Sequence, residues 1–325
     1  MRILVTGACG FVGPYLVKAL VESGGHEVIA SVHNRALGET ANCCGEPLTT
    51  LADQIVELDV TDGMACGELI GEFRPECVYH LAGLAFAPDA AAHFDKALSV
   101  NVHGPFNICQ ALADHCPRSR MIFASSGEVY GAIAEDELPI REEQLARPMN
   151  PYSLTKLQAE AAVEFFARRA GIPTVIARPF NHFGPGQSEK FVTAAFASQL
   201  ARIALGKQPA QLLVGNLDAK RDFTDVRDII DGYVALLNAK EGCYNLCAGQ
   251  APSIQEILDI LVEESGVSVE IQQDSTRMRP AEVPEVRGSF EKIHEACGWA
   301  PKRELRDSLR ELYEYWLKKE SELKG

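Results

Sequence analysis

The chain has 325 residues, 46% of them hydrophobic, and carries a formal net charge of −14 at pH 7. A chain of this length can bury a large core and commonly divides into two units. Its negative charge disfavours binding to nucleic acids and to anionic membrane surfaces, so we expect neither partner. The first apolar run is too short for a signal peptide or a membrane span, and we expect a cytoplasmic protein. Its ten cysteines contain no CxxC pair, so we expect reduced thiols and no metal site.

The first half of the chain alternates strand and helix patterns. Short apolar runs indicate strands at 2–6, 27–32, 55–58, 77–81, 121–124 and 174–178. Helical patterns lie at 11–23, 94–116 and 152–170. Repeated strand–helix units predict an α/β fold with a parallel, doubly wound sheet of the Rossmann type.

The second half has a looser pattern. Helices are predicted at 191–205, 226–237, 254–264 and 305–317, with short strands near 212–214, 244–247 and 269–271. We interpret it as a smaller C-terminal α/β lobe that binds substrate. The predicted division places 1–178 in the Rossmann domain, to which 225–250 are expected to return, and 179–325 in the second lobe.

A glycine-rich loop follows the first predicted strand directly. Gly7, Gly10 and Gly13 form a GxxGxxG motif, with Phe11 and Val12 inside it. Such a backbone turns tightly, and the following helix N-terminus offers N–H groups to a pyrophosphate. An ordinary glycine-rich turn can have the same composition, but the position after an N-terminal strand predicts dinucleotide binding.

The end of the second strand indicates which dinucleotide binds. His33, Asn34 and Arg35 stand where NAD-binding proteins place an acidic residue. The absence of a carboxylate and the presence of Arg35 favour NADP, although Arg35 can also be a surface residue and NAD remains possible. Asp59 follows the third strand and either contacts adenine or caps a helix.

Further cofactor contacts are expected where other strands end. These residues are Val60, Leu81, Ala82 and Ala124. Ligands of doubly wound sheets bind along the carboxyl ends of the strands.

Tyr152 and Lys156 are spaced i, i+4 and share one face of a predicted helix. A lysine cation beside a phenol favours the phenolate, so we expect the pKa of Tyr152 to be lowered. Ser126 follows the strand at 121–124, where its hydroxyl can bind a carbonyl oxygen. A YxxxK spacing also arises by chance, but together with the glycine loop it predicts a catalytic group that also contacts the cofactor.

Several motifs resemble the extended short-chain dehydrogenase/reductase family over essentially the whole chain. They are the loop at 7–13, His80-Leu81-Ala82-Gly83, Asn101, the segment 125–131 and the segment 152–156. The resemblance implies that Ser126, Tyr152 and Lys156 act together and that Lys156 holds the nicotinamide ribose. It also implies a supporting role for Asn101, and a homodimer formed through the helices at 94–116 and 152–170.

The second lobe is similar to the GDP-mannose branch of that family, at 178–187, 191–193, 215–228 and 279–284. This implies a reductase that transfers hydride from NADPH to the C4 ketone of GDP-4-keto-6-deoxy-D-mannose, giving GDP-D-rhamnose. Arginine suits the diphosphate because its planar fork grips two oxygens. The expected substrate-binding residues are Ser126, Asn181, Gln187, Val192, Arg221, Arg279 and Glu282.

Other functions remain open. In dehydratases of this branch a glutamate at the position of Glu128 removes the sugar C5 proton, so a GDP-mannose 4,6-dehydratase is an alternative, as is another nucleotide-sugar epimerase. Gly127 departs from the Asp or Ser found beside it in dehydratases. An NADP-sensing module without catalysis would be expected to have lost the Tyr152–Lys156 pair, which is intact.

Overall fold

The structure is a computed structural model that describes the chain except for residues 35, 37–41, 44, 275–282 and 324–325. Its centre is a seven-stranded parallel sheet in the order β13-β8-β7-β6-β1-β2-β5. The strands are β1 Arg2–Thr6, β2 Glu27–Val32, β5 Gln54–Glu57, β6 Cys77–His80, β7 Arg120–Ala124, β8 Thr174–Pro179 and β13 Gly242–Leu246. The predicted doubly wound α/β fold is confirmed.

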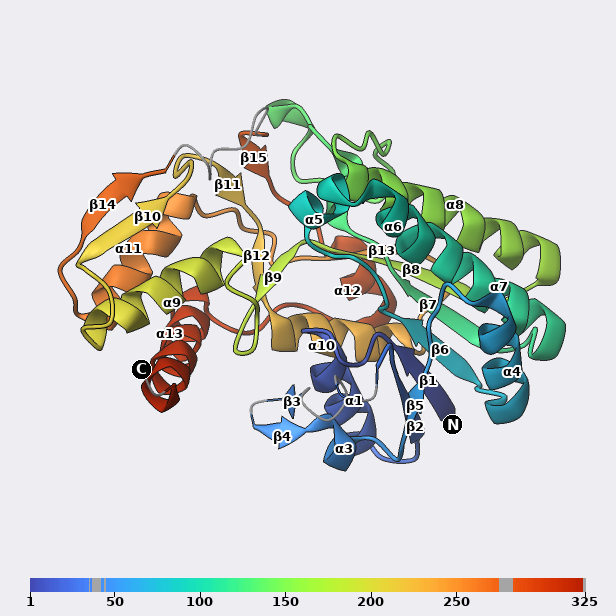
Figure 1. Cartoon of the computed structure of the whole chain (residues 1–325). Coiled ribbons are helices and arrows are strands. Elements are labelled where there is room, and N and C mark those ends of the chain that lie inside the picture. Colours follow the sequence, from blue (N-terminus) through green and yellow to red (C-terminus); the bar gives the residue numbers. More distant parts are fainter. Residues whose placement is uncertain (35, 37–41, 44, 275–282, 324–325) are drawn as a thin grey trace.

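Helices cover both faces of this sheet (Figure 1). One face carries α1 Gly13–Glu22 and α10 Val226–Leu236, and the other carries α4 Gly63–Phe73, α7 Gly104–His115 and α8 Pro151–Ala170. Successive strand residues point to opposite faces, so Ile3 and Val5 enter the first core while Leu4 enters the second. Strands buried on both sides explain the continuous apolar runs of the sequence.

The helix expected at 94–116 is interrupted. It consists of α6 Phe94–Leu98, a π-helical turn at Ser99–His103, and α7. Pro105 has no backbone N–H to donate to the carbonyl of Asn101, so the regular α pattern cannot pass through this point. The wider turn places Asn101 in an irregular segment, a frequent feature of functional sites.

The second lobe has its own core. It is built by α9 Val192–Ala204, α11 Ile254–Ser265 and α13 Leu305–Glu322, with the parallel pair β10 Gln211–Val214 and β14 Glu270–Gln273. Ser253 and Glu256 form a capping box at the start of α11, and Gly266 ends it in a left-handed conformation. In Figure 1 these elements lie to one side of the large sheet.

Short strands join the two parts. β9 Asn181–Phe183 pairs with β12 Phe223–Asp225, and β11 Lys220–Arg221 pairs with β15 Glu285–Val286. Buried Asp222 accepts the backbone N–H groups of Ala248, Gly249 and Gly288. Periodicity did not predict these pairs, because strands of two or three residues are too short to show a repeat.

Smaller elements complete the described chain. They are β3 Asn42–Cys43, β4 Glu46–Pro47, α3 Leu48–Leu51, α5 Ala87–Ala92, α12 Glu291–Cys297 and the 3₁₀ turns Gly127–Tyr130 and Glu135–Glu137. Among the described residues, no helix is long and apolar enough to cross a membrane. The same residues contain no cluster of three or more His, Cys, Asp or Glu side chains that could hold a metal ion.

Candidate active site

The glycine loop is shaped by close backbone contacts. Gly7 has a φ of +71°, and a Cβ there would lie 2.6 Å from the backbone nitrogen of Ala82. A Cβ on Gly13 would lie 2.4 Å from the carbonyl oxygen of Ala8. Between them, Gly10 donates its N–H to the Gly7 carbonyl at 3.0 Å. Glycine is therefore required for the loop to reach this shape.

The first helix, α1, begins at the end of the glycine loop, with Pro14 in its first turn. Val12 is its N-cap residue and makes no side-chain cap bond within the described part of the chain. The first N–H groups of a helix attract anions, so this end fits the pyrophosphate of a dinucleotide. Phe11 stacks on His182 with ring centroids 6.1 Å apart, and the Tyr15 hydroxyl donates to the Pro185 carbonyl at 2.7 Å. The loop is thereby held against the start of the second lobe.

At the end of β2, the structure describes two of the three predicted cofactor residues. His33 lies 4.0 Å from the carboxylate of Asp59, and both side chains are exposed. Hydrogen bonds from Thr61 lower the pKa of Asp59. The side-chain oxygen of Asn34 accepts the backbone N–H of Ala36 at 2.8 Å. Arg35 lies outside the described residues.

The remaining predicted cofactor residues lie along the carboxyl edge of the sheet. Val60 follows β5, Leu81 and Ala82 follow β6, and Ala124 ends β7. The backbone N–H of Leu81 bonds the Thr6 carbonyl at 3.2 Å, and that of Ala82 bonds the Thr6 hydroxyl at 3.4 Å. These bonds hold the end of β6 against the end of β1, beside the glycine loop.

Tyr152 and Lys156 lie in the first turns of α8, and both are buried. The helix starts with a reciprocal capping box between Asn150 and Ser153, which fixes the helix start next to Tyr152. The Lys156 ammonium donates to the carbonyl oxygen of Ala124 at 2.7 Å. This bond links the helix to the end of β7, where Ser126 follows two residues later.

The direction of the Tyr152 pKa differs from the sequence expectation. Burial raises it, the charge of Glu128 adds to the increase, and the interaction with Ser126 opposes it. Burial also lowers the pKa of Lys156 to about 8, against the effect of Glu160. The expectation of a lowered phenol pKa is therefore wrong, because removal of both groups from water disfavours both charged forms.

Ser126 and Glu128 stand at the turn that follows β7. The Ser126 hydroxyl caps this turn by accepting the Glu128 amide at 3.1 Å. The exposed Glu128 carboxylate accepts the side-chain amide of Asn150 at 2.9 Å. Gly127 stands between Ser126 and Glu128. A Cβ on it would lie 2.8 Å from the Phe180 ring, so this position has room only for a hydrogen atom.

Asn101 connects the loop after β6 to α8. Its side-chain oxygen accepts the Leu84 amide at 2.7 Å, and its side-chain nitrogen donates to the Leu84 carbonyl at 3.2 Å. The same nitrogen donates to the Thr155 hydroxyl at 3.0 Å. Its side chain is thus fully engaged in holding the backbone beside Lys156.

Gln187 and Val192 lie where the second lobe begins. Gln187 is buried, donates to the His182 carbonyl at 2.8 Å and accepts from the Thr193 hydroxyl at 3.1 Å. Val192 is the first residue of α9 and is partly buried. Gln187 therefore braces the entrance to α9, while Val192 offers an apolar surface.

The polar substrate candidates come from the strands that join the two parts. Asn181 is exposed in β9, and Arg221 is partly buried in β11, where it donates to the Lys220 carbonyl at 2.8 Å. Arg279 and Glu282 lie outside the described residues. The structure therefore describes four of the six second-lobe residues that were predicted to contact the substrate, and their role stays a prediction.

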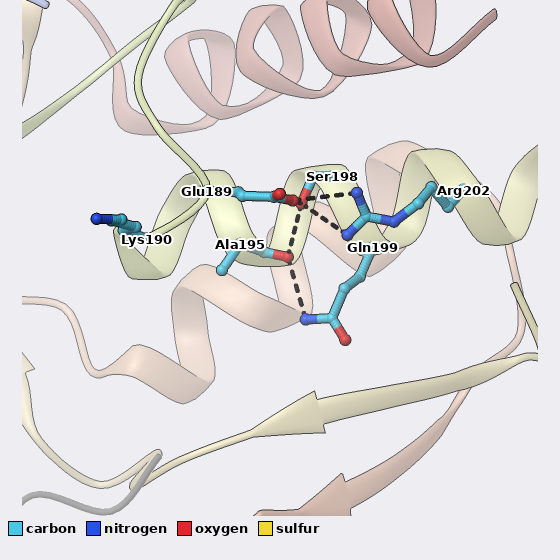
Figure 2. A pocket seen from close by; sticks show the side chains of 6 residues that line it. All are labelled: Glu189, Lys190, Ala195, Ser198, Gln199 and Arg202. Atoms are coloured by element: carbon cyan, nitrogen blue, oxygen red, sulfur yellow. Dashed lines mark hydrogen bonds and ion pairs between the residues drawn. The ribbon is translucent and has the colours of Figure 1, made fainter. Parts of the chain in front are cut away.

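A cavity of about 330 Å³ lies beside α9 (Figure 2). Its lining residues all belong to the second lobe: Glu189, Lys190, Ala195, Ser198, Gln199 and Arg202. Helical spacing puts Ala195 and Gln199 on the same side of α9 as Val192. Arg202 bonds Glu189 at 3.0 Å, and Gln199 bonds the Ala195 carbonyl at 3.1 Å, so its polar groups are largely engaged with one another.

A buried ion pair that the sequence patterns did not indicate joins α8 to β8. Glu160, one helical turn after Lys156, bonds Arg178 of β8 through two hydrogen bonds, at 2.9 and 2.6 Å. The i, i+4 spacing of Glu160 from Lys156 was the available signal.

Comparisons with known proteins place the chain in a family. A family model described as GDP-mannose 4,6 dehydratase matches residues 4–312. The GDP-6-deoxy-D-mannose reductase of Pseudomonas aeruginosa is 37% identical over 317 residues, which cover 97% of each chain.

Two solved structures extend these comparisons. The structure of RMD from Pseudomonas aeruginosa complexed with NADPH has 36% identity and a TM-score of 0.84, covering 98% of this chain and 99% of that one. The UDP-glucose 4-epimerase of Thermus thermophilus in complex with NAD has 27% identity and a TM-score of 0.83, covering 97% of this chain and 99% of that one. The chain therefore belongs to the GDP-mannose 4,6-dehydratase family of extended short-chain dehydrogenases/reductases.

Proposed function

We propose that this chain is an NADPH-dependent reductase that acts on the C4 ketone of GDP-4-keto-6-deoxy-D-mannose and forms GDP-D-rhamnose. The observation that carries this proposal is the nearly full-length similarity to a GDP-6-deoxy-D-mannose reductase. The proposal is also supported by three side chains at the carboxyl edge of the sheet, beside the glycine loop: Ser126, Tyr152 and Lys156. Bound NADPH supplies the hydride; the protein supplies position, protons and electrostatics.

Tyr152 is the proposed acid. Because its pKa is raised, the phenol retains its proton at neutral pH and can donate it to the alkoxide that forms at C4. The Ser126 oxygen accepts the Glu128 amide, which leaves its own proton for a hydrogen bond to the reacting oxygen. Each group thereby stabilises charge where it develops.

Lys156 is proposed to orient the ribose next to the nicotinamide. Its ammonium has three donors, of which one is directed to the Ala124 carbonyl. With a pKa of about 8, it is mostly charged at neutral pH. Asn101 would keep this region in shape through its bonds to Leu84 and Thr155.

The GDP moiety is assigned to the second lobe. Arg221 and Asn181 would hold the diphosphate, and Gln187 and Val192 would form the adjoining wall. Arg279 and Glu282 remain part of this proposal on the strength of their sequence context, for the diphosphate and the ribose respectively.

Product analysis tests the function. Incubation with GDP-4-keto-6-deoxy-D-mannose and NADPH should yield GDP-D-rhamnose, with one NADPH consumed per product. Tyr152→Phe is the matched control for non-enzymatic reduction. Conversion of the sugar without net loss of NADPH would contradict the reductase assignment.

A dehydratase activity is the second candidate. It is favoured by Glu128, whose carboxylate acts electrostatically on Tyr152 and stands next to Ser126. Incubation with GDP-mannose and NADP⁺ should then release water and produce the 4-keto-6-deoxy sugar. Loss of this product in Glu128→Gln, with retained reduction of the 4-keto sugar, would assign the proton transfer to Glu128.

We also propose a cytoplasmic homodimer. Phe106 of α7 is 44% exposed, and Leu154 and Phe165 of α8 are 39% and 48% exposed. Phe106 also contacts Phe166 edge to face at 5.1 Å, so apolar side chains from both helices adjoin one another. Pairing of α7 and α8 with a second copy would cover them. Light scattering that finds a monomer at micromolar concentration would contradict the dimer.

A further inference from the structure

A buried charged network lies directly behind the catalytic residues. Glu160 and Arg178 are only 4% and 8% exposed, and Arg178 grips the carboxylate of Glu160 with Nε at 2.9 Å and Nη2 at 2.6 Å. A face of the guanidinium lies over the Tyr130 ring, with its central carbon 4.7 Å from the ring centroid. The carboxylate also accepts the hydroxyl of buried Ser125.

Glu160 continues the row of proposed active-site residues along α8. Tyr152, Lys156 and Glu160 are spaced by four residues, so they occupy three successive turns on one side of α8. Lys156 bonds the carbonyl of Ala124, and Glu160 bonds the side chain of Ser125. Two neighbouring turns of the helix therefore hold the two residues that precede Ser126.

We propose that Glu160 is a positioning residue that fixes the Ser126 backbone against α8 and supplies the counter-charge for Lys156. The effect of Glu160 on catalysis rests on the proposed reductase function. Its effect on the charge of Lys156 does not depend on that function. Arg178 balances Glu160 from the opposite side. The charges therefore alternate through the interior: Lys156 positive, Glu160 negative, Arg178 positive.

The surroundings of Lys156 agree with this role. Burial lowers its pKa to about 8, and Glu160 acts in the opposite direction. Two other titratable groups near Lys156 carry no negative charge: burial lowers the pKa of His80, in β6, to about 3, and Tyr152 retains its proton. Glu128, on the turn after β7, acts on Tyr152. Glu160 is thus the carboxylate that keeps Lys156 protonated near neutral pH.

The test measures the Lys156 titration directly. Protein labelled with ¹³C at lysine Cε is titrated by NMR without substrate, and the Lys156 signal is assigned with Lys156→Arg. Glu160→Gln retains an oxygen for Ser125 but removes the charge, so the Lys156 midpoint should fall by about one pH unit, the effect of a unit charge one helical turn away. Arg178→Gln should shift the midpoint upward, because it removes a repelling cation.

Glu164→Gln is the matched control. Glu164 lies one turn further along α8, is half exposed and pairs with Arg168 at 3.3 Å. Its removal should leave the Lys156 midpoint unchanged. A purely structural role for the ion pair would lower the melting temperature of both variants without shifting the Lys156 midpoint in opposite directions. That result would overturn the proposal, and Arg178→Gln decides alone if Glu160→Gln does not fold.

Steady-state kinetics test whether Glu160 affects catalysis. In Glu160→Gln, the basic limb of the kcat/KM profile for ketone reduction should move to lower pH together with the Lys156 midpoint. A profile that stays in place while the midpoint shifts would overturn the link to catalysis. If the unmodified protein reduces no GDP-4-keto sugar, the proposed function fails, while the NMR titration still decides the role of Glu160.

Discussion

Gly13→Ala provides a stringent test of the cofactor loop. The added Cβ would lie 2.4 Å from the carbonyl oxygen of Ala8, where backbone rather than a flexible side chain blocks it. The free protein can relieve this overlap by shifting the loop, but the cofactor requires the original shape. The strain therefore appears in the free energy of binding. Overpacking of this kind costs roughly 1–3 kcal/mol, which corresponds to NADPH affinity weaker by about 5- to 150-fold.

The assay is NADPH binding by fluorescence or calorimetry, accompanied by thermal unfolding. Gly67→Ala is the matched control, because its Cβ would meet the His115 ring at an ordinary 3.8 Å in the middle of α4. It should bind NADPH normally and be as stable as the unmodified protein or slightly more stable. A Gly13→Ala protein that folds and binds NADPH as tightly as the control would refute the assignment of the loop to the cofactor.

Three further predictions concern the reaction. Tyr152→Phe should lower kcat by about 10²- to 10⁴-fold and leave NADPH affinity nearly intact, since only the proton donor is lost; retained turnover would show that another group is the acid. Reductase activity should decline above pH 8, because Lys156 loses its charge near its pKa of about 8 while the raised pKa of Tyr152 keeps the phenol protonated; a flat kcat/KM profile between pH 7 and about 10 would contradict this. Arg221→Ala should raise KM for the sugar nucleotide about ten- to a hundred-fold with little change in kcat, because the diphosphate charge is the same in the ground and transition states; an unchanged KM would place the diphosphate elsewhere.

Local patterns in the sequence were sufficient to predict the fold class of this protein. The apolar strand runs and the helical periodicity predict the parallel sheet, because both repeats depend only on near neighbours along the chain. The glycine loop and the Tyr152–Lys156 spacing are also local, so they could be identified without coordinates. The resemblance based on these motifs predicted the family, which the comparisons confirm. The roles of the individual residues remain predictions.

Features that depend on burial and on distant contacts could be decided only by the tertiary structure. The pKa of Tyr152 is raised rather than lowered, because the folded chain buries the phenol in a cluster with Ala90 and Ala97, which are distant in sequence. Gly127 has no room for a side chain because Phe180, the residue that follows β8, packs against it. Glu160 bonds Arg178 only because α8 packs against the sheet that contains β8. Desolvation and packing are sums over neighbours in space, and a one-dimensional pattern records only neighbours along the chain.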